Sequence, residues 1–194
     1  MRTDLQSLAT AVSMLVLTGL THAAQPSFTS VEAQLNGFIA SDSDVLDNQA
    51  RLGLKGSYAF NPNYFISFSS NQISGGSSLA RNTDIGVGRR FAVTDESALY
   101  GSLGARRFGG CGQFESCSTS ASSTVARATG GIRSQWNERF ETDLSLTGFE
   151  PDAAQDWEAV LKGTYFFTER VGASMEVGSI DGDSIGSLGL RLNF

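Results

Sequence analysis

Apolar and polar residues alternate with a period of two along most of the chain. Near its end, Leu188, Leu190 and Leu192 alternate with Gly189 and Arg191. A period of two places successive side chains on opposite faces of a β-strand, whereas a helix repeats every 3.6 residues. The region after the first thirty residues or so lacks helical periodicity, so the pattern predicts an all-β protein.

Turn-forming residues divide this pattern into ten predicted strands. Most of them are 10 to 12 residues long. This exceeds the usual length in a soluble sheet and suits a tilted strand that crosses a bilayer. The predicted strands are 30–40, 49–60, 64–74, 82–93, 97–108, 123–136, 140–149, 156–167, 171–180 and 184–194.

The connections between these strands alternate between two classes. Four are short turns, at 61–63, 94–96, 137–139 and 168–170. The others are longer, polar loops, which place an acidic ring at the opposite end of the sheet. Solvated loops are the simpler interpretation of these acids, and Ca²⁺ or Mg²⁺ binding is the alternative. The acidic positions are Asp42, Asp44, Asp47, Glu150, Asp152, Asp156, Asp181 and Asp183.

Large aromatic residues gather beside the short turns, where a membrane barrel carries an interfacial girdle. A soluble sandwich would more often bury such rings in mid-strand. Phe65, Phe166 and Phe194 belong to the same rim. The predicted girdle consists of Tyr58, Phe60, Tyr64, Phe91, Trp136, Phe140, Tyr165 and Phe167.

The two strand faces differ sharply in charge. One face is apolar and nearly free of charge, as a lipid-facing surface requires. The other carries both signs, including Glu32, Asp84 and Arg127, and would fill a narrow barrel interior with ion pairs. The alternative is the solvent-facing surface of a soluble sandwich. The predicted ion-pair network consists of Arg51, Lys55, Arg90, Arg106, Arg133, Glu141, Asp143, Glu158, Lys162, Glu176 and Arg191.

Arg89 breaks the alternation, because it shares its face with Ile85, Val87 and Phe91. A regular strand would point this arginine toward lipid. Two explanations stay open: the side chain reaches toward the rim, or a β-bulge re-aims it.

Residues 1–23 resemble a secretory signal, with a charged start, an apolar middle and small residues before the break. His22 is the single histidine, so the mature chain would have none. Its absence removes the usual base of Ser-His and Cys-His hydrolases and the commonest metal ligand. We therefore predict no catalytic residues, no metal site and no cofactor. The net charge of −6 disfavours nucleic-acid binding.

The two cysteines, Cys111 and Cys117, lie close together in one of the longer loops. A secreted chain meets an oxidising compartment, so we expect a disulfide between them, with free thiols as the alternative.

The whole mature chain resembles the small outer-membrane β-barrels of Gram-negative bacteria, of the OmpA/OmpX type. The signal, the alternating strands, the aromatic-flanked turns and the ending "LGLRLNF" carry this resemblance. It implies a closed antiparallel up-and-down transmembrane barrel over 30–194, preceded by a periplasmic lead at 24–29. We count ten strands, with eight as the alternative, since common small members have eight.

The resemblance also implies location and partners: the outer membrane, its lipid bilayer and lipopolysaccharide, and the outer-membrane assembly machinery. The assembly signal would be Leu188, Leu190, Leu192 and Phe194. The surface partner is unknown from the sequence.

Two functions are compatible with a barrel of this size. The first is a non-enzymatic barrel, plugged by its own charged side chains, whose loops serve envelope integrity, adhesion or surface interaction. The alternative is a narrow passive, porin-like channel for small solutes or ions, because many positions on the polar face are Gly or Ser. An enzyme is disfavoured by the missing histidine.

Overall fold

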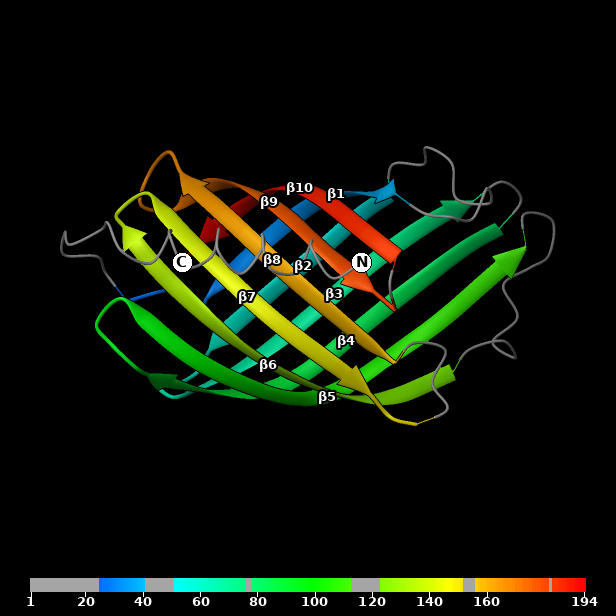
Figure 1. Ribbon diagram of the computed structural model, residues 1–194, viewed down its shortest axis with the longest axis horizontal. Helices are drawn as coiled ribbons and strands as arrows, with labels where there is room; N and C mark the ends of the chain where they lie inside the picture. Colours follow the sequence, from blue (N-terminus) through cyan, green and yellow to red (C-terminus); the bar gives the residue numbers. More distant parts are fainter. Residues whose placement is uncertain (1–24, 41–50, 76–77, 113–122, 152–155, 182) are drawn as a thin grey trace, which may run out of the picture.

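The computed structural model is a closed barrel of ten antiparallel strands in up-and-down order (Figure 1). It describes residues 25–40, 51–75, 78–112, 123–151, 156–181 and 183–194. The predicted fold class is confirmed, and the eight-stranded alternative is wrong. The strands are β1 Ser30–Ala40, β2 Arg51–Ala59, β3 Tyr64–Gly75, β4 Ser78–Ala92, β5 Ser97–Gly112, β6 Ser123–Asn137, β7 Phe140–Phe149, β8 Trp157–Phe166, β9 Val171–Ile180 and β10 Asp183–Asn193.

The barrel closes between its first and last strands. β1 and β10 pair in a continuous register from Ser30↔Asn193 to Phe38↔Ile185. Because hydrocarbon offers no hydrogen-bond partners, a membrane-spanning sheet must satisfy its edges in this way. The strand at the end of the sequence is therefore half of the seam.

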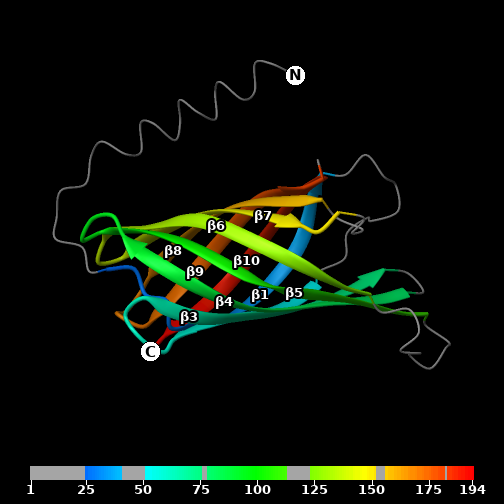
Figure 2. The same cartoon turned by 90° about the horizontal axis from the view of Figure 1, so that it is seen from below.

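The four short turns lie together at one end of the barrel, which we call the turn end; the opposite end is the loop end (Figure 2). A side-chain oxygen near the start of each turn accepts a hydrogen bond from a backbone N–H two residues later. These oxygens belong to Asn61, Thr94, Asn137 and Thr168. Asn and Thr favour turns because they form such local bonds. The sequence thus encodes the tight connections directly.

At the loop end, β4 and β5 extend further than the alternation predicts. The β3–β4 pairing continues to Gly75↔Ser78, and β5 reaches Gly112. A backbone ladder needs no apolar side chains once a strand has left lipid, so polar residues there continue the hairpin. The hydrophobic pattern therefore marks the lipid-facing part of a strand rather than its full length.

The apolar face points outward along every strand. Leu103 is 72% exposed, and Leu52 and Ile85 are each 67% exposed. Leu144 and Met175 on the same face are also exposed, at 47% and 58%. Large exposed apolar areas of this kind mark a surface that meets lipid or a partner. Within the described ranges, no helix is long and apolar enough to cross a membrane.

Arg89 lies on this outward face without a bulge. The registers of β4 with β3 and with β5 both run through Arg89 without interruption. Its guanidinium carbon lies 4.6 Å from the ring centre of Phe91 and 5.6 Å from that of Tyr64. The side chain therefore reaches into the aromatic rim, where cation–π contacts favour it.

Gly104 provides a test of how closely the barrel wall is packed. A Cβ at residue 104 would lie 2.2 Å from the Ile85 carbonyl oxygen and 2.8 Å from Gly86 Cα, both backbone atoms. We expect Gly104→Ala to lower the free energy of unfolding by about 1–3 kcal/mol, the usual cost of overpacking. Urea titration of the refolded protein, followed by tryptophan fluorescence, measures this.

The matched control is Gly148→Ala, because a Cβ at residue 148 meets nothing within 4 Å. Equal stability of the two variants would contradict the close approach of β4 and β5.

Candidate functional site: the charged interior

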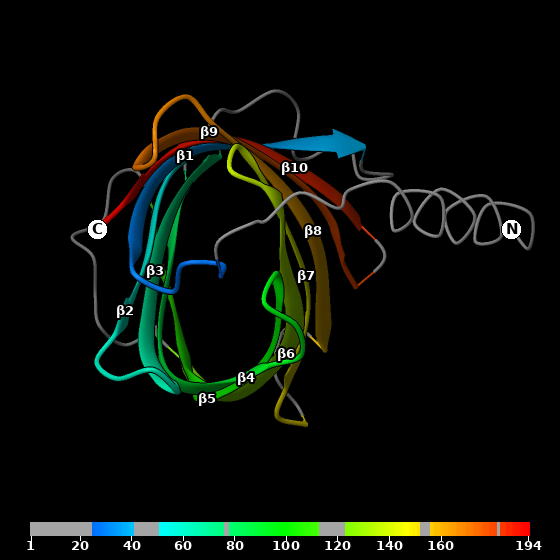
Figure 3. The ribbon, with the colours of Figure 1, turned by 90° about the vertical axis from the view of Figure 1, so that its left-hand side faces the viewer.

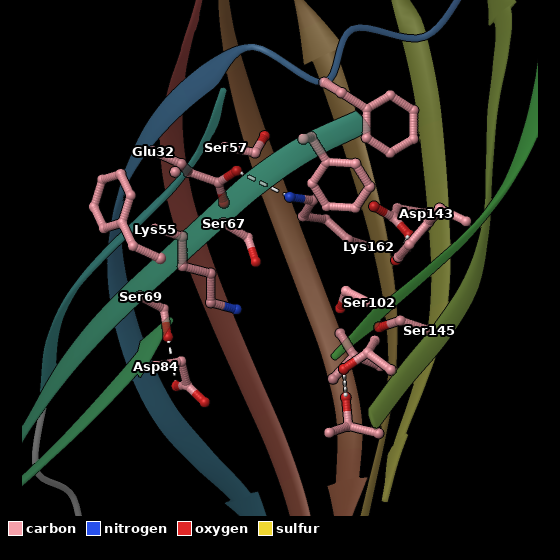
Figure 4. A pocket seen from close by; sticks show the side chains of 18 of the residues that line it. Glu32, Lys55, Ser57, Ser67, Ser69, Asp84, Ser102, Asp143, Ser145 and Lys162 are labelled. Carbon is pink, nitrogen blue, oxygen red and sulfur yellow. Dashed lines mark hydrogen bonds and ion pairs between the residues drawn. The ribbon is translucent and has the colours of Figure 1, made fainter. Parts of the chain in front are cut away.

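The interior of the barrel is the candidate site. A cavity of about 200 Å³ lies within it, lined by charged residues, serines and a few rings (Figure 4). The charged side chains form three clusters, which follow one another from the turn end toward the loop end.

The turn-end cluster consists of Arg133, Glu141, Asp143 and Arg191. Arg133 donates two hydrogen bonds to Asp143 Oδ2, at 2.8 and 2.6 Å. Arg191, 1% exposed, pairs with Glu141 across the barrel, from β10 to β7. The Tyr100 hydroxyl donates to Asp143 Oδ1 at 2.7 Å.

The middle cluster consists of Glu32, Lys55, Lys162 and Glu176. Lys162 Nζ lies 3.0 Å from Glu32 Oε2, and Figure 4 shows this pair bridging β8 and β1. Lys55 Nζ donates to both oxygens of Glu176, at 2.8 and 2.9 Å. Gln34 donates to both glutamates and so joins the two pairs.

The loop-side cluster consists of Asp84, Arg106, Arg127 and Glu158. Arg106 bridges Asp84 at 2.8 Å and Glu158 at 3.0 Å. Arg127 Nε lies 3.1 Å from the same oxygen of Asp84. Ser69 donates to the other Asp84 oxygen at 2.7 Å. The carboxylate of Asp84 is thus held by three side chains from β3, β5 and β6.

Each cluster contains two cations and two anions, so the paired interior is neutral. Several pairs join strands that are not neighbours: β10 with β7, β2 with β9, β8 with β1 and β5 with β8. A buried charge is tolerated only when it is paired and hydrogen-bonded. These pairs therefore cross-link the barrel through its centre.

The segment before β1 closes the turn end of the interior. In Figure 3, the blue stretch that precedes β1 curls into the barrel mouth. Phe28 is 2% exposed. The Ser27 carbonyl oxygen accepts hydrogen bonds from Arg133 at 2.6 Å and Arg191 at 3.1 Å. The predicted periplasmic lead, or at least residues 25–29 of it, thus lies against the turn-end cluster.

Phe28 packs in an inward aromatic group. Its ring centre lies 5.0 Å from that of Phe65 and 5.6 Å from that of Tyr100. The Arg133 guanidinium carbon lies 4.4 Å above the Phe28 ring. We call Phe28, Phe65 and Tyr100 the aromatic cap. It combines apolar packing with cation–π contacts, which strengthen when water is excluded.

Phe65 and Phe166 therefore differ from the rest of the aromatic rim. Phe65 is 4% and Phe166 3% exposed, and both point inward. Parity explains this: Phe65 alternates with the outward Ile66, and Phe166 with the outward Tyr165. Strand parity could have separated these two rings from the girdle. Phe28 precedes the first strand, so no parity predicted its position.

A few polar atoms of the interior lack a partner. Gln34, Glu141 and Thr164 each have one buried oxygen without a hydrogen bond, as does Ser187. Thr164 of β8 pairs in register with Glu141 of β7 and with Ser174 of β9. Ser174 pairs with Gly189 of β10, and Gly189 pairs with Gln34 of β1. The oxygens of Glu141, Thr164 and Gln34 therefore lie along one row of the wall, whereas Ser187 pairs with Asn36 and Glu176. Ordered water commonly satisfies buried oxygens of this kind.

Most members of the predicted ion-pair network meet in these clusters, and two do not. Arg90 donates to the Pro62 carbonyl oxygen, and its guanidinium lies over Phe28. It thus serves the aromatic cap rather than an ion pair. The backbone of Arg51 belongs to β2, but its side chain lies outside the described part. The clusters also contain Glu32, Asp84 and Arg127, which are assigned to the polar face but not to the predicted ion-pair network.

The predicted girdle residues gather at the turn end. Tyr58, Phe60, Phe91 and Phe167 are at least half exposed. Tyr64 and Tyr165 are exposed, whereas Trp136 and Phe140 are half-buried. Trp136 donates to Thr142 at 2.8 Å.

The predicted assembly signal is also on the outside. Leu188, Leu190, Leu192 and Phe194 are all exposed on or just after β10.

Two predictions lie outside the described residues. Residues 1–23, the expected signal, are one of them, and Cys117 of the expected disulfide is the other. Cys111 belongs to β5 by its backbone, and its side chain is not described.

Comparison with known proteins gives likeness in structure alone. No protein-family model and no curated protein sequence matches the chain. The chain is similar to a NanC porin (13% identity, 86% of this chain and 98% of the other, TM-score 0.49). It is also similar to the KdgM porin (10% identity, 85% and 99%, TM-score 0.47) and to Yersinia pestis Ail (18% identity, 86% and 98%, TM-score 0.45).

The Arg191–Glu141 pair offers a test of the cross-links. Removing Arg191 leaves the buried Glu141 carboxylate with only the longer contact to Arg133 Nε at 3.8 Å. We therefore expect Arg191→Met to lower the free energy of unfolding by about 3 kcal/mol, the lower end of the cost of breaking a buried pair. The double variant Arg191→Met/Glu141→Leu should recover much of this loss. Urea titration of the refolded barrel measures both.

The control is Arg170→Met, because Arg170 is exposed in the turn between β8 and β9. A loss for Arg191→Met no greater than that of this control would show that the pair contributes little.

Proposed function

We propose that the protein is a small outer-membrane barrel of a Gram-negative bacterium, non-enzymatic and closed to solutes. Its loops would act at the cell surface in envelope integrity, adhesion or another surface interaction. One observation carries the proposal: a neutral set of ion pairs fills the interior and crosses it from wall to wall.

The outward surface supports the membrane location. It is apolar over the middle of the strands, and its aromatic residues gather at the turn end. Bacterial outer-membrane barrels place their short turns in the periplasm and their longer loops outside. On that basis the turn end faces the periplasm. The lipid bilayer, lipopolysaccharide and the assembly machinery are then the expected partners, and the surface partner would meet the loops.

The carboxylates of the interior support a non-catalytic role. All six in the clusters have a cationic partner within 4.0 Å. A general acid or base needs a proton that can leave or arrive, whereas these groups are held as ion pairs. Ion pairing is therefore the simpler role of these acids.

One acidic loop position has a structural role. Asp181 has a φ of 49°, and its carboxylate accepts hydrogen bonds from the backbone N–H groups of Asp156 and Trp157, both at 3.0 Å. Asp tolerates this left-handed conformation better than most residues. This favours the interpretation of the acids as loop-forming, solvated residues. The acids within 41–50 and 152–155 lie outside the described residues.

A narrow channel is the second candidate. The unpaired oxygens of Gln34, Glu141, Thr164 and Ser187 could be bridged by water. The cavity of about 200 Å³ is large enough for several water molecules. Such a path would pass small ions or water at most, because the ion pairs cross the rest of the interior.

Single-channel recording in a planar bilayer distinguishes the two functions. We expect the wild-type barrel to show no steady openings. Phe28→Ala should stay closed as well, because the ion pairs of the middle and loop-side clusters still cross the interior. The matched control is Phe167→Ala, which removes a 61% exposed ring from the same end and should stay closed.

Steady openings of the wild-type protein would contradict the closed barrel and support the channel. Openings of Phe28→Ala but not of Phe167→Ala would show instead that the aromatic cap, and not the ion pairs, closes the barrel.

A further inference from the structure

A hollow lies on the lipid-facing wall. A groove of about 610 Å³ crosses β5 to β7 on the outward face, lined by Leu99, Gly101, Gly130, Ile132, Leu144 and Leu146. Gly101 and Gly130 are direct cross-strand partners. A Cβ at residue 130 would meet nothing within 4 Å, and one at residue 101 would come no closer than 3.9 Å to its neighbour. The hollow therefore exists because two adjacent side chains are missing.

A positive charge borders this groove. Arg89 faces Gly101 in the β4–β5 register. Its guanidinium lies over Phe91, which also lines the groove. Of the strand residues whose side chains are described, Arg89 and Arg107 are the charged ones exposed on the outward face. No carboxylate of the described residues forms an ion pair with Arg89. A fixed cation thus stands beside the groove, with two rings to support it.

The groove runs from the rim toward the middle of the wall. Arg89, Gly101, Gly130, Leu146 and Ala159 follow one another in register across five strands. Arg89 lies three residues from the turn end of β4, whereas Ala159 lies seven residues from the turn end of β8. Each residue adds about 3.3 Å along a strand. The row therefore rises from the headgroup level into the hydrocarbon.

We propose that this groove binds one anionic glycerophospholipid of the leaflet at the turn end. Its phosphate pairs with Arg89, and an acyl chain fills the hollow above Gly101 and Gly130. The inference rests on the proposed membrane location. Arginine matches phosphate oxygens with two parallel hydrogen bonds, which a lysine cannot do. The volume falls within the range of small-molecule sites, about 300–1,000 Å³.

The position of Arg89 supports an anionic ligand. An outward arginine is far less costly near the membrane interface than at the bilayer midplane. Near the rim the charge is therefore tolerated, and an outward guanidinium without a counter-ion among the described residues favours a phosphate. The aromatic contacts hold the guanidinium in place, which lowers the entropy lost on binding.

Native mass spectrometry of the protein in detergent micelles with added phosphatidylglycerol tests the proposal. We expect the wild type to retain one phosphatidylglycerol and to retain it better than phosphatidylethanolamine. Arg89→Gln removes the cation, and Gly130→Leu fills the hollow. Each should lower the bound fraction at least fivefold. Because a Cβ at residue 130 meets no atom, Gly130→Leu should fold.

Two matched controls separate this site from general changes of charge and size. Arg139→Gln removes an exposed cation from a turn at the same end, and Gly148→Leu fills an outward glycine outside the groove. Both should bind lipid like the wild type. Wild-type retention in Arg89→Gln and Gly130→Leu would overturn the proposal. The proposal would also be overturned if the wild type formed a dimer and Gly130→Leu abolished the dimer without loss of bound lipid, because a second copy of the chain would then fill the groove.

The proposed function can fail separately. A refolded protein that does not insert into vesicles would contradict the membrane location itself. An inserted protein without lipid selectivity would contradict the lipid site alone.

Discussion

The interior ion pairs are the constraint on which the rest of the structure depends. A barrel of ten strands has room inside for side chains and little else, and charges placed there lose their water. Neutrality within each cluster resolves this cost, because each cation has a carboxylate of a facing or neighbouring strand. The pairing also restricts strand register. A slip of one residue would turn every charge into lipid and every leucine into the interior.

The same constraint explains where small residues are needed. A Cβ at Gly189 would lie 2.5 Å from Ser174 Oγ and 2.9 Å from Glu32 Oε1. The glycine thus leaves room for the carboxylate that Lys162 binds. On the outward face, Gly130 and Gly148 have open space beside them, so a side chain there would meet no neighbouring atom at its Cβ. The inward Gly189 makes room for a charged partner, whereas these outward glycines shape the surface that lipid meets.

Much of the fold could be predicted because lipid and water each restrict which residues can stand at a given position. Lipid requires apolar side chains at every second position, and the turns require Asn or Thr, so strand number and face follow from the pattern. The pairing of charges on strands that are not neighbours could not be predicted in this way. Alternation assigns Asp84 to the interior, and the β4–β5 register places it opposite Arg106, but neither rule pairs it with Arg127 of β6. Phe28 escaped prediction because it lies before the first strand.

The two ends of the interior are closed by different means, and this asymmetry bears on function. At the turn end, Phe28 and the Ser27 carbonyl group lie against Arg133, so apolar packing and charge act on the same guanidinium. Further along, Arg106 lies between Asp84 and Glu158 with the Phe149 ring 4.7 Å away. Removing one ring at the turn end leaves the ion pairs of the other two clusters intact. A passage that opened there would therefore still have to cross two neutral layers of paired charge. Such layers oppose the entry of a single ion, because its charge would compete with a partner that is already bound. This favours the closed barrel over a conducting one.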